Sequence, residues 1–384
     1  MSTLRYLTAG ESHGRQLTAI VEGCPSRLEV AASDIDADLA RRQLGFGRGE
    51  RQAIEHDHVQ ILSGVRYGLT TGAPIALVVE NRDAANWGDV LAVEKPATPA
   101  EPVRVPRPGH ADLGGALLYD LPDLRDVIER ASARETAARV ACGAVARRLL
   151  RVLDCEVFSH VREIGGVRAA ETSLDDLATV DGDPLRCLDR AASEAMQAAV
   201  AAAGERGDTL GGVFEVVAFG FPPGVGSYVE ADRRLGARLA AALMSVPAVK
   251  GVELGMGFPA SRLAGSEVHD PIAYDEERGY YRETNRAGGV EGGMSTGEPI
   301  VVRAAMKPIA TLRTPLASVE MGTHAAVDSR FERSDVCAVP AAAVVGEAAL
   351  ALALAAAALE RFGGATVEEF ADAVEAARRR ARRL

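Results

Sequence analysis

Lysine is nearly absent from this chain of 384 residues. Only Lys95, Lys250 and Lys307 occur, so arginine supplies the other 40 of the 43 basic residues. Acidic residues number 54 and the formal net charge is −11. This balance excludes a broad nucleic-acid-binding surface, which needs concentrated positive charge. The arginine excess is mainly a compositional bias, so an arginine indicates anion binding only where its sequence neighbours also do.

Cysteine is scarce as well, with five residues at positions 24, 142, 155, 187 and 337 and no CxxC pair. An odd number without paired spacing, in a chain this long, excludes a disulfide scaffold and argues against a thiolate metal site. The N-terminal residues lack a signal-peptide pattern, and the most apolar stretch, residues 348–359, covers about half a membrane span. We therefore expect a cytoplasmic protein without a membrane partner.

Several nucleotide and metal motifs are also missing. None of the three lysines follows a glycine, which excludes a Walker A loop, and neither a helix-opening GxGxxG nor HExxH occurs. His56 and His58 flank Asp57 and would share one face of a strand. A third ligand is missing beside them, so a metal role is the weaker interpretation of these histidines.

The hydrophobic pattern predicts strands and helices that do not alternate as βαβ units. Strands are expected at residues 4–9, 54–64, 73–80, 155–161, 213–219 and 299–306, and helices at 32–44, 123–153, 187–204, 232–244, 341–361 and the C-terminus. This order favours an α+β fold with antiparallel sheet. Because no repeat or linker divides the sequence, we expect a single domain over residues 1–384.

Charged side chains lie beside glycines in four parts of the chain. In residues 10–14 (GESHG), His13 follows a predicted strand where a ligand has room to approach, although a turn histidine without a task fits equally well. Arg42 and Arg48 flank the glycines of residues 41–49 (RRQLGFGRG). This arrangement suits bidentate recognition of phosphate or carboxylate, and a solvated helix end is the alternative.

The third and fourth groups add further histidines and cations. A Pro-Gly turn displays His110 in residues 107–112 (RPGHAD). Arg130 and Arg134 are four residues apart and are predicted to share one helix face, either toward a ligand or as surface ion pairs with neighbouring glutamates. The fourth group comprises residues 284–289, 291–297, 307–311 and 333–337, in which repeated glycines allow close approach to a ligand and Lys307 stands out, with flexible surface turns as the alternative. From these residues alone, the sequence predicts an enzyme that binds a polyanion.

Taken in order, these segments resemble the chorismate synthase family. The matching segments are residues 10–14 (GESHG), 41–49 (RRQLGFGRG), 107–112 (RPGHAD), 130–136 (RASARET), 284–289 (TNRAGG) with 292–299 (GGMSTGEP), 307–311 (KPIAT) and 333–341 (RSDVCAVPA). Each segment is weak evidence by itself. Seven of them in order span nearly the whole chain.

The resemblance implies a lyase of the shikimate pathway. Its seventh step, in aromatic amino acid biosynthesis, is the 1,4-anti elimination of phosphate from 5-enolpyruvylshikimate 3-phosphate (EPSP) to give chorismate. The resemblance further implies a need for reduced FMN, an association with FAD and NADP, and a homotetramer. The implied fold is an α+β, β-α-β sandwich with antiparallel sheets around core helices. Because no large insertion is present, we expect an external flavin reductase to supply the reduced flavin and NADPH to enter through that reductase.

By the same resemblance, three residues carry the chemistry. His13 is expected to be the general acid for the leaving phosphate, His110 to protonate or stabilise the reduced flavin, and Asp335 to relay a proton there. The expected substrate residues are Arg42, Arg48, Arg107, Arg134 and Arg333, and the first two also match a proposed site for a nicotinamide dinucleotide phosphate. The expected FMN residues are Arg130, Ala131, Ser132, Pro247, Ala248, Gly292, Lys307, Pro308, Ile309, Ala310, Thr311 and Arg333.

Two positions depart from the family pattern. Ala310 replaces a common serine, and Ala84 replaces a usual bulky aromatic residue, so both bear on affinity more than on chemistry. Two other functions compete with the family assignment. One is a non-catalytic flavin- or polyphosphate-binding protein. The other is a metal-dependent phosphohydrolase that would use His56, His58, His110 and Asp112.

Overall fold

The N-terminal part of the chain forms an antiparallel sheet of four strands. The computed structural model describes residues 4–48, 56–276, 278–331 and 335–383. The sheet has the order β1-β2-β6-β3 and consists of β1 (Arg5–Ala9), β2 (Gln16–Glu22), β6 (Ile75–Glu80) and β3 (Val59–Ser63). In β2, Leu17, Ala19 and Val21 are buried while the residues between them are more exposed. This alternation gives the sheet one apolar face.

A second antiparallel sheet contains five strands from the middle of the chain. Its order is β10-β15-β9-β7-β8, from β10 (Val249–Leu254), β15 (Ile300–Met306), β9 (Gly212–Phe219), β7 (Glu156–Ile164) and β8 (Val167–Arg168). Strand β9 is central, and Phe214, Val216 and Ala218 point from it into the main hydrophobic core. Register shifts occur in β10 and in β7.

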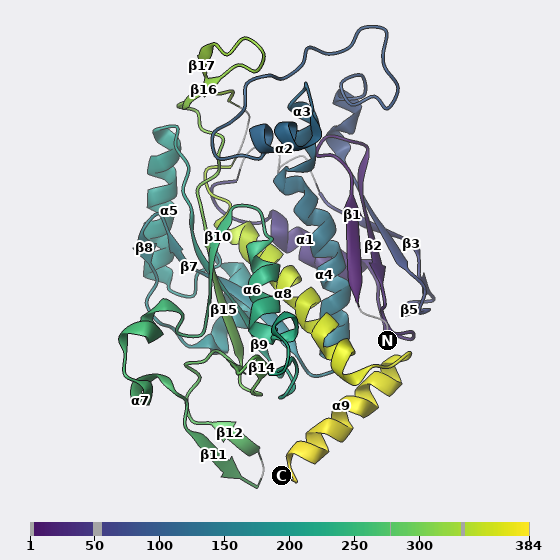
Figure 1. The fold of residues 1–384 in the computed structure, drawn as a ribbon, viewed down its shortest axis with the longest axis vertical. Helices are drawn as coiled ribbons and strands as arrows, with labels where there is room; N and C mark the ends of the chain where they lie inside the picture. The colour runs from purple at the N-terminus through teal and green to yellow at the C-terminus, as the bar shows by residue number, and fades with distance from the viewer. Residues whose placement is uncertain (1–3, 49–55, 277, 332–334, 384) are drawn as a thin grey trace.

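Helices fill the space between the two sheets. The layer is formed by α1 (Ala32–Gln43), α4 (Thr136–Arg151), α6 (Leu235–Met244) and α8 (Val339–Phe362). Figure 1 shows α4 and α8 side by side in the centre, with β1 to β3 on one side and β7, β9, β10 and β15 on the other. Helix α8 is long and apolar enough to cross a membrane, but 89% of its most apolar window is buried inside the protein. It is therefore a core helix.

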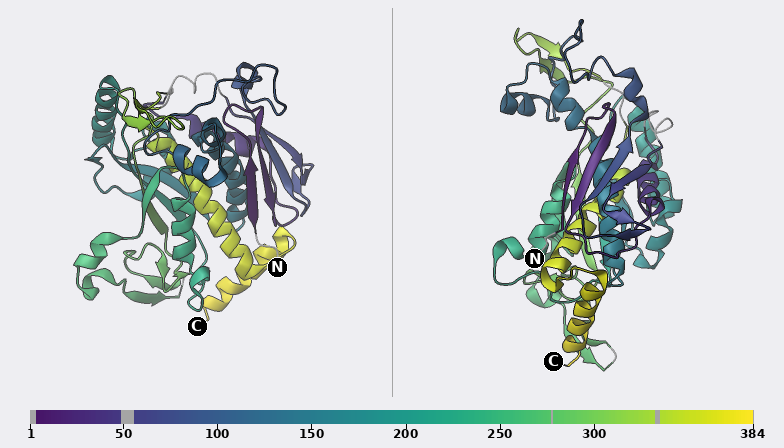
Figure 2. Two further views of the ribbon diagram at one scale, coloured as in Figure 1. Left: turned by 45° about the horizontal axis from the view of Figure 1, so that its top comes forward. Right: turned by 90° about the vertical axis from the view of Figure 1, so that its right-hand side faces the viewer.

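Smaller elements surround this sandwich (Figure 2). Helices α2 (Asp112–Tyr119) and α3 (Arg125–Arg130) cover the end where β1 finishes and α4 and α8 begin. Helices α5 (Arg190–Glu205) and α9 (Val367–Ala381) pack on the outside of the sandwich, and Met196 and Phe370 join them to the main core. The remaining described elements are η2 (Arg82–Asn86), η3 (Ala133–Glu135), η4 (Leu174–Gly182), η5 (Ala231–Arg233), η6 (Phe258–Arg262), α7 (Gly265–Val268), β4 (Val65–Arg66), β5 (Leu69–Thr70), β11 (Ile272–Asp275), β12 (Gly279–Arg282), β13 (Val290–Glu291), β14 (Met294–Ser295), β16 (Ala317–Val319) and β17 (Ala326–Asp328).

The prediction of one continuous helix over residues 123–153 is wrong. Ser132 has extended backbone angles (φ −65°, ψ 147°), and its Oγ accepts a hydrogen bond from the backbone N–H of Arg134. Serine favours this capping role because its short side chain satisfies an N–H that a new helix leaves open. The break separates α3 from η3 and α4, so Arg130 and Arg134 do not share a helix face. Each makes different contacts, described below.

The predicted fold class and most of the predicted strands and helices agree with the structure. The α+β class and the sandwich of antiparallel sheets around core helices are confirmed. Strand boundaries such as β9 and β15, and helices such as α1 and α8, lie within a few residues of the predicted ranges. His56 and His58 are an exception, since β3 begins only at Val59 and the two histidines do not lie on a strand.

Candidate active site

His13 is held by a buried carboxylate from α3. It lies in the loop after β1, where Glu129 Oε1 accepts from its Nδ1 at 2.8 Å and Glu129 Oε2 accepts from its backbone N–H at 2.7 Å. The Glu129 side chain is only 3% exposed. The indole of Trp87 stacks on the imidazole with ring centroids 4.0 Å apart and an interplanar angle of 19°. One edge and one face of the His13 ring are thus fixed by other side chains.

Asp57 pairs with two of the predicted arginines at once. Its Oδ2 accepts from Arg42 Nη2 at 3.0 Å, and its Oδ1 accepts from Arg134 Nη1 at 2.5 Å. All three side chains are nearly inaccessible, with 0% exposure for Asp57 and 6% for each arginine. Asp57 is therefore an ion-pair partner of the arginines, rather than the centre of a metal motif.

Asn81 connects this arginine pair to the loop that carries His13. Its Oδ1 accepts from Arg134 Nε at 2.8 Å, while its Nδ2 donates to the carbonyls of Glu11 at 3.2 Å and Gly14 at 2.7 Å. Asn81 is itself buried. The predicted acid and the predicted phosphate-binding arginines are therefore neighbours, although they come from distant parts of the sequence.

Positive charge is in excess around Arg42. Burial, opposed by Asp57 but reinforced by the charges of Arg48 and Arg134, brings the pKa of the Arg42 guanidinium down to about 10. The Nε groups of Arg42 and Arg48 are buried and find no acceptor within the described ranges. A buried donor without an acceptor destabilises the fold. An anion bound at this cluster would supply the missing acceptors and so stabilise it.

Arg48 pairs with Asp335, the residue predicted to relay a proton. Arg48 Nη1 lies 3.0 Å from Asp335 Oδ2. Next to this contact, the carbonyl of Gly47 accepts from the backbone N–H of Val336 at 2.8 Å. The early arginine segment and the late RSD segment are thus brought together. Arg333, in the same late segment, lies outside the described residues.

His110 belongs to a second charged group, built on Asp112 at the start of α2. Asp112 is fully buried. It accepts from Arg107 Nε at 2.9 Å and contacts His110 Nδ1, while Arg107 Nη1 donates to Thr311 Oγ1 at 3.3 Å. Burial raises the pKa of the Asp112 carboxyl, but His110 and Arg107 outweigh burial and hold it well below its usual value. Asp112 is therefore an anion that fixes both neighbours.

The segment that carries Lys307 packs against the turn before His110. Lys307 Nζ donates to the carbonyl of Gly109 at 2.8 Å, and the Lys307 backbone N–H donates to the carbonyl of Ala248 at 2.9 Å. Burial and the charge of Lys250 lower the pKa of Lys307. Two of the three lysines are thus neighbours, and Pro247 precedes Ala248 at the same place.

Backbone contacts place the two charged groups on the same side of the protein. Thr209 Oγ1 donates to the carbonyl of Ile309 at 2.8 Å, and the adjacent Leu210 N–H donates to the carbonyl of Val336 at 2.9 Å. Ile309 lies between Pro308 and Ala310 in the lysine segment, whereas Val336 follows Asp335. Both groups therefore lie at the end of the sandwich that α2 and α3 cover (Figure 1).

Arg130 and Ser132 contact the loop of His13. Arg130 Nη2 donates to the Thr8 carbonyl at 3.0 Å and Nη1 donates to the Gly10 carbonyl at 3.3 Å. Ser132 Oγ donates to Ser12 Oγ at 3.1 Å. Ala131, between them, ends α3. Residues 130–132 therefore border the same loop that Glu129 holds.

Gly292 is separated from the other predicted flavin residues. It lies between β13 and β14, which adjoin the start of β15, whereas Lys307 follows the end of β15. Six steps along an extended strand correspond to about 20 Å. A cavity of about 440 Å³ includes Gly292, Asp270 and Ala287 in its lining at that far end.

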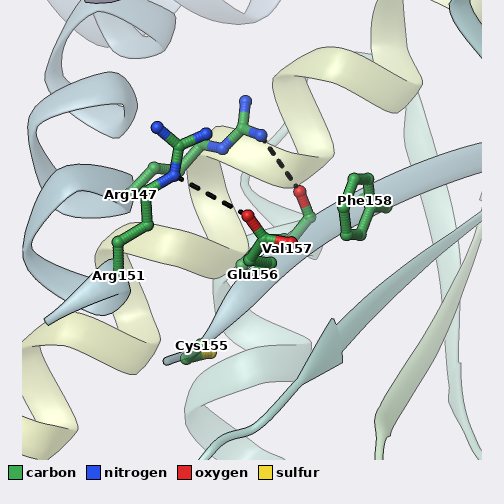
Figure 3. Close-up of a pocket in the computed structure, with 6 residues that line it drawn as sticks. All are labelled: Arg147, Arg151, Cys155, Glu156, Val157 and Phe158. Atoms are coloured by element: carbon green, nitrogen blue, oxygen red, sulfur yellow. Dashed lines mark hydrogen bonds and ion pairs between the residues drawn. The ribbon is translucent and has the colours of Figure 1, made fainter. Parts of the chain in front are cut away.

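The small pocket in Figure 3 lies away from both histidines. Its volume is about 30 Å³, and Arg147, Arg151 and Glu156 are among its lining residues. Arg147 Nη2 donates to the Val157 carbonyl at 3.3 Å, and Arg151 faces Glu156 (Figure 3). It lies at the far end of α4, about 20 Å from the first turn of that helix. Arg147 also pairs with Asp38 and Glu347, so its charge is already compensated and does not indicate a ligand site.

A metal centre is not supported. Within the described ranges, no group of three or more histidine, cysteine or acidic residues is placed to hold a metal ion. His58 pairs with Asp36 at 3.3 Å and is exposed, while Asp57 is occupied by arginines. The residues proposed for a phosphohydrolase, His56, His58, His110 and Asp112, therefore do not form one ligand set.

Two residues of the site were not identified from the sequence. Glu129 entered only through the alternative in which neighbouring glutamates form surface ion pairs with Arg130 and Arg134, and that alternative does not hold for Glu129 because it is buried against His13. Asn81 was not singled out, although Ala84, three residues later, was noted as a departure from the family pattern. The one available signal was position, since Glu129 immediately precedes the matched segment at residues 130–136. Its contact with His13 spans 116 residues of sequence, and such a pairing has no local pattern.

Comparison with known proteins identifies the family of the chain. The sequence model of the chorismate synthase family matches residues 4–359 of this chain. A chorismate synthase from Geobacillus thermodenitrificans is 55% identical, covering 99% of this chain and 100% of that protein. One from Desulforudis audaxviator is 56% identical, covering 96% of each. A crystal structure of a chorismate synthase superposes with a TM-score of 0.81 at 40% identity, covering 100% of this chain and 99% of that one. The chain therefore belongs to the chorismate synthase family.

Proposed function

We propose that the site around His13 and the buried arginines converts EPSP to chorismate and phosphate. Membership of the chorismate synthase family makes this chain a phosphate-eliminating lyase of amino-acid biosynthesis. The observation that supports the location is a chain of hydrogen bonds. It runs from the loop that carries His13, through Asn81, to Arg134. From there it continues through Asp57 to Arg42. A proton donor there lies beside the positive charge that a phosphate leaving group requires.

Substrate binding is assigned to the arginines at this end of the sandwich. EPSP carries two carboxylates and a phosphate, and Arg42, Arg48, Arg107 and Arg134 are close to the two histidines, with Arg333 as the fifth candidate. The Nε groups of Arg42 and Arg48, which meet no acceptor in the described part of the chain, are suitable donors. Helices α4 and α8 also begin here, and the partial positive charge of a helix N-terminus adds to the attraction. The guanidinium groups of Arg42 and Arg48 would bind the phosphate of a nicotinamide dinucleotide in the same way as they bind the phosphate of EPSP.

The residues present also fit an anionic flavin. Lys307 beside Lys250 is a partly buried cation whose pKa is lowered, so an anion there relieves both burial and repulsion. We assign FMN binding to Lys307 and its segment through Thr311, to Pro247 and Ala248, and to Arg130, Ala131, Ser132 and Arg333. Reduced FMN supplies the electron-rich partner for breaking a C–H bond that no neighbouring carbonyl acidifies.

The chain's own residues then handle protons. His13 gives a proton to the departing phosphate. His110, held by Asp112 and next to Arg107, provides a proton or a hydrogen bond to the bound cofactor. Asp335, oriented by Arg48, accepts and returns a proton near the same ligand.

Further properties belong to the same proposal. Exposed apolar residues of α2, Leu117, Leu118 and Tyr119, lie a few residues after His110, and such a patch favours burial against another subunit in a homotetramer. A site shared between two subunits would also bring Gly292 of one subunit close to Lys307 of another, although the two residues lie far apart within one chain. We place the enzyme in the cytoplasm, as one domain, with reduced flavin from an external reductase, to which NADPH would bind.

The deciding experiment is anaerobic turnover of EPSP with reduced FMN. Chorismate absorbance and released phosphate should rise together in equal amounts, and a chelator should leave the rate unchanged. Loss of activity with the chelator would favour a metal-dependent phosphohydrolase. Binding of FMN without any phosphate release would favour a flavin-binding protein without catalysis.

Replacing Lys307 by methionine should weaken FMN binding by about 10- to 100-fold, because a charge-assisted hydrogen bond contributes about 1.5–3 kcal/mol. Methionine keeps most of the side-chain volume and removes the charge. The measurement is quenching of flavin fluorescence on titration with protein. Lys95→Met removes an exposed lysine and should leave the affinity unchanged. Equal affinities for the parent and Lys307→Met would remove Lys307 from the cofactor site.

A further inference from the structure

Glu129 makes three separate contacts with the dipeptide Ser12-His13. Its two carboxylate oxygens accept from the His13 ring and from the His13 backbone N–H. Its backbone carbonyl accepts from the Ser12 N–H at 3.1 Å. A loop between glycines has no fixed conformation of its own. The last turn of α3 therefore determines where His13 lies.

Trp87 completes the enclosure of the ring. It is the only tryptophan in the chain, and it stacks on His13 with an interplanar angle of 19°. Trp87 is itself held, since its Nε1 donates to Asp83 Oδ2 at 3.2 Å. Stacking restricts tilting of the imidazole, while Glu129 restricts rotation within its plane. The ring is left with one defined orientation.

We infer that Glu129 is the positioning residue for His13 and selects its tautomer. A carboxylate has no proton to donate, so Nδ1 must carry the hydrogen that Glu129 accepts. Nε2, on the far side of the ring from Glu129, then delivers the proton. In that step the Nε2–H bond breaks and an O–H bond forms on the departing phosphate. The ring returns to its neutral Nδ1–H form. This inference rests on the proposed role of His13.

Glu129→Gln tests the inference because it keeps the shape and removes one acceptor. The single amide oxygen can satisfy only one of the two His13 N–H groups. If it keeps the backbone N–H, the amide NH₂ faces Nδ1, and the neutral ring must move its hydrogen to Nε2. We expect kcat to fall about 100-fold, within the range that a positioned acid contributes, with little change in KM. Asp126→Asn, on the exposed face of the same helix, should keep the parent kcat.

A double-mutant cycle separates positioning from general damage. In a His13→Ala background, Glu129→Gln should reduce kcat by less than about twofold, because two residues that act through one group are not additive. A further loss of about 100-fold there would overturn the inference, as would a parent-like kcat for Glu129→Gln alone. If His13→Ala itself keeps the parent rate, the proposed acid role fails instead.

Nitrogen NMR of the intact protein, labelled at histidine, reads the tautomer directly. The His13 signals are assigned by their loss in His13→Ala. The neutral parent ring should carry its hydrogen on Nδ1, and the ring in Glu129→Gln should carry it on Nε2. A parent ring protonated at Nε2 alone would overturn the inference even if the Glu129 variant failed to fold.

Discussion

Replacing Asp57 by asparagine should lower the free energy of unfolding by about 3–5 kcal/mol, the usual cost of breaking a buried ion pair from one side. Asparagine keeps the size of the side chain but removes the charge that faces Arg42 and Arg134. Both guanidinium groups are almost inaccessible to water, and the charge of Arg48 already acts on Arg42. Urea unfolding of the parent and the variant, followed by circular dichroism, measures the difference.

Glu22→Gln is the matched control. It removes a carboxylate that pairs with Arg5 on the protein surface, and exposed pairs contribute less than about 1 kcal/mol. If Asp57→Asn were no less stable than Glu22→Gln, the buried arginines would not depend on Asp57. Inorganic phosphate should raise the melting temperature of Asp57→Asn more than that of the parent, because an anion would replace the missing charge.

The stability that Asp57 contributes should also depend on pH. Burial raises the pKa of the Asp57 carboxyl, but Arg42 and Arg134 outweigh burial and bring it below its usual value. A group with a lowered folded-state pKa stabilises the fold fully above its unfolded pKa of about 4, and this contribution is lost as pH falls through the folded value. The difference between the parent and Asp57→Asn should therefore be largest near neutral pH and should shrink below about pH 4.

Local patterns in the sequence were sufficient for most of the fold. Strands such as β2 and β9 and helices such as α8 are recognisable because burial follows the period of two or of 3.6 residues within one segment. The break at Ser132 was missed because the apolar stripe of α4 extends back through α3, and one capping hydrogen bond decides the boundary. Such a competition between a cap and a continuous stripe is not visible in the hydrophobic pattern.

The sequence was sufficient to predict which segments carry the site residues. It was not sufficient to predict which of these residues contact one another. His13, Arg48 and His110 were identified because each stands next to a glycine in a predicted loop. The pairing of Asp57 with Arg134 spans 77 residues, and no local pattern specifies it. The prediction that Arg130 and Arg134 share a helix face is wrong because the helix breaks between them at Ser132. Gly292 was grouped with Lys307 by resemblance alone, and β15 separates them.

His13→Ala should reduce kcat with EPSP and reduced FMN by about 10²- to 10⁴-fold, the range that one positioned general acid contributes. The leaving phosphate would then depart without a proton, and the buried arginines would stabilise its charge only in part. KM should change little, because the arginines, which bind the substrate, keep their own partner Asp57. Stopped-flow absorbance of chorismate under anaerobic conditions measures the rate.

The control for this loss is His58→Ala, which removes an exposed histidine that pairs only with Asp36 among the contacts of the described residues. It should turn over EPSP at the parent rate. Parent-like turnover by His13→Ala would show that water or another group delivers the proton. A loss that is matched by weaker substrate binding, with kcat unchanged, would instead make His13 a binding residue. Only a fall in kcat alone places the proton transfer at His13, because an interaction made only in the transition state lowers kcat without raising KM.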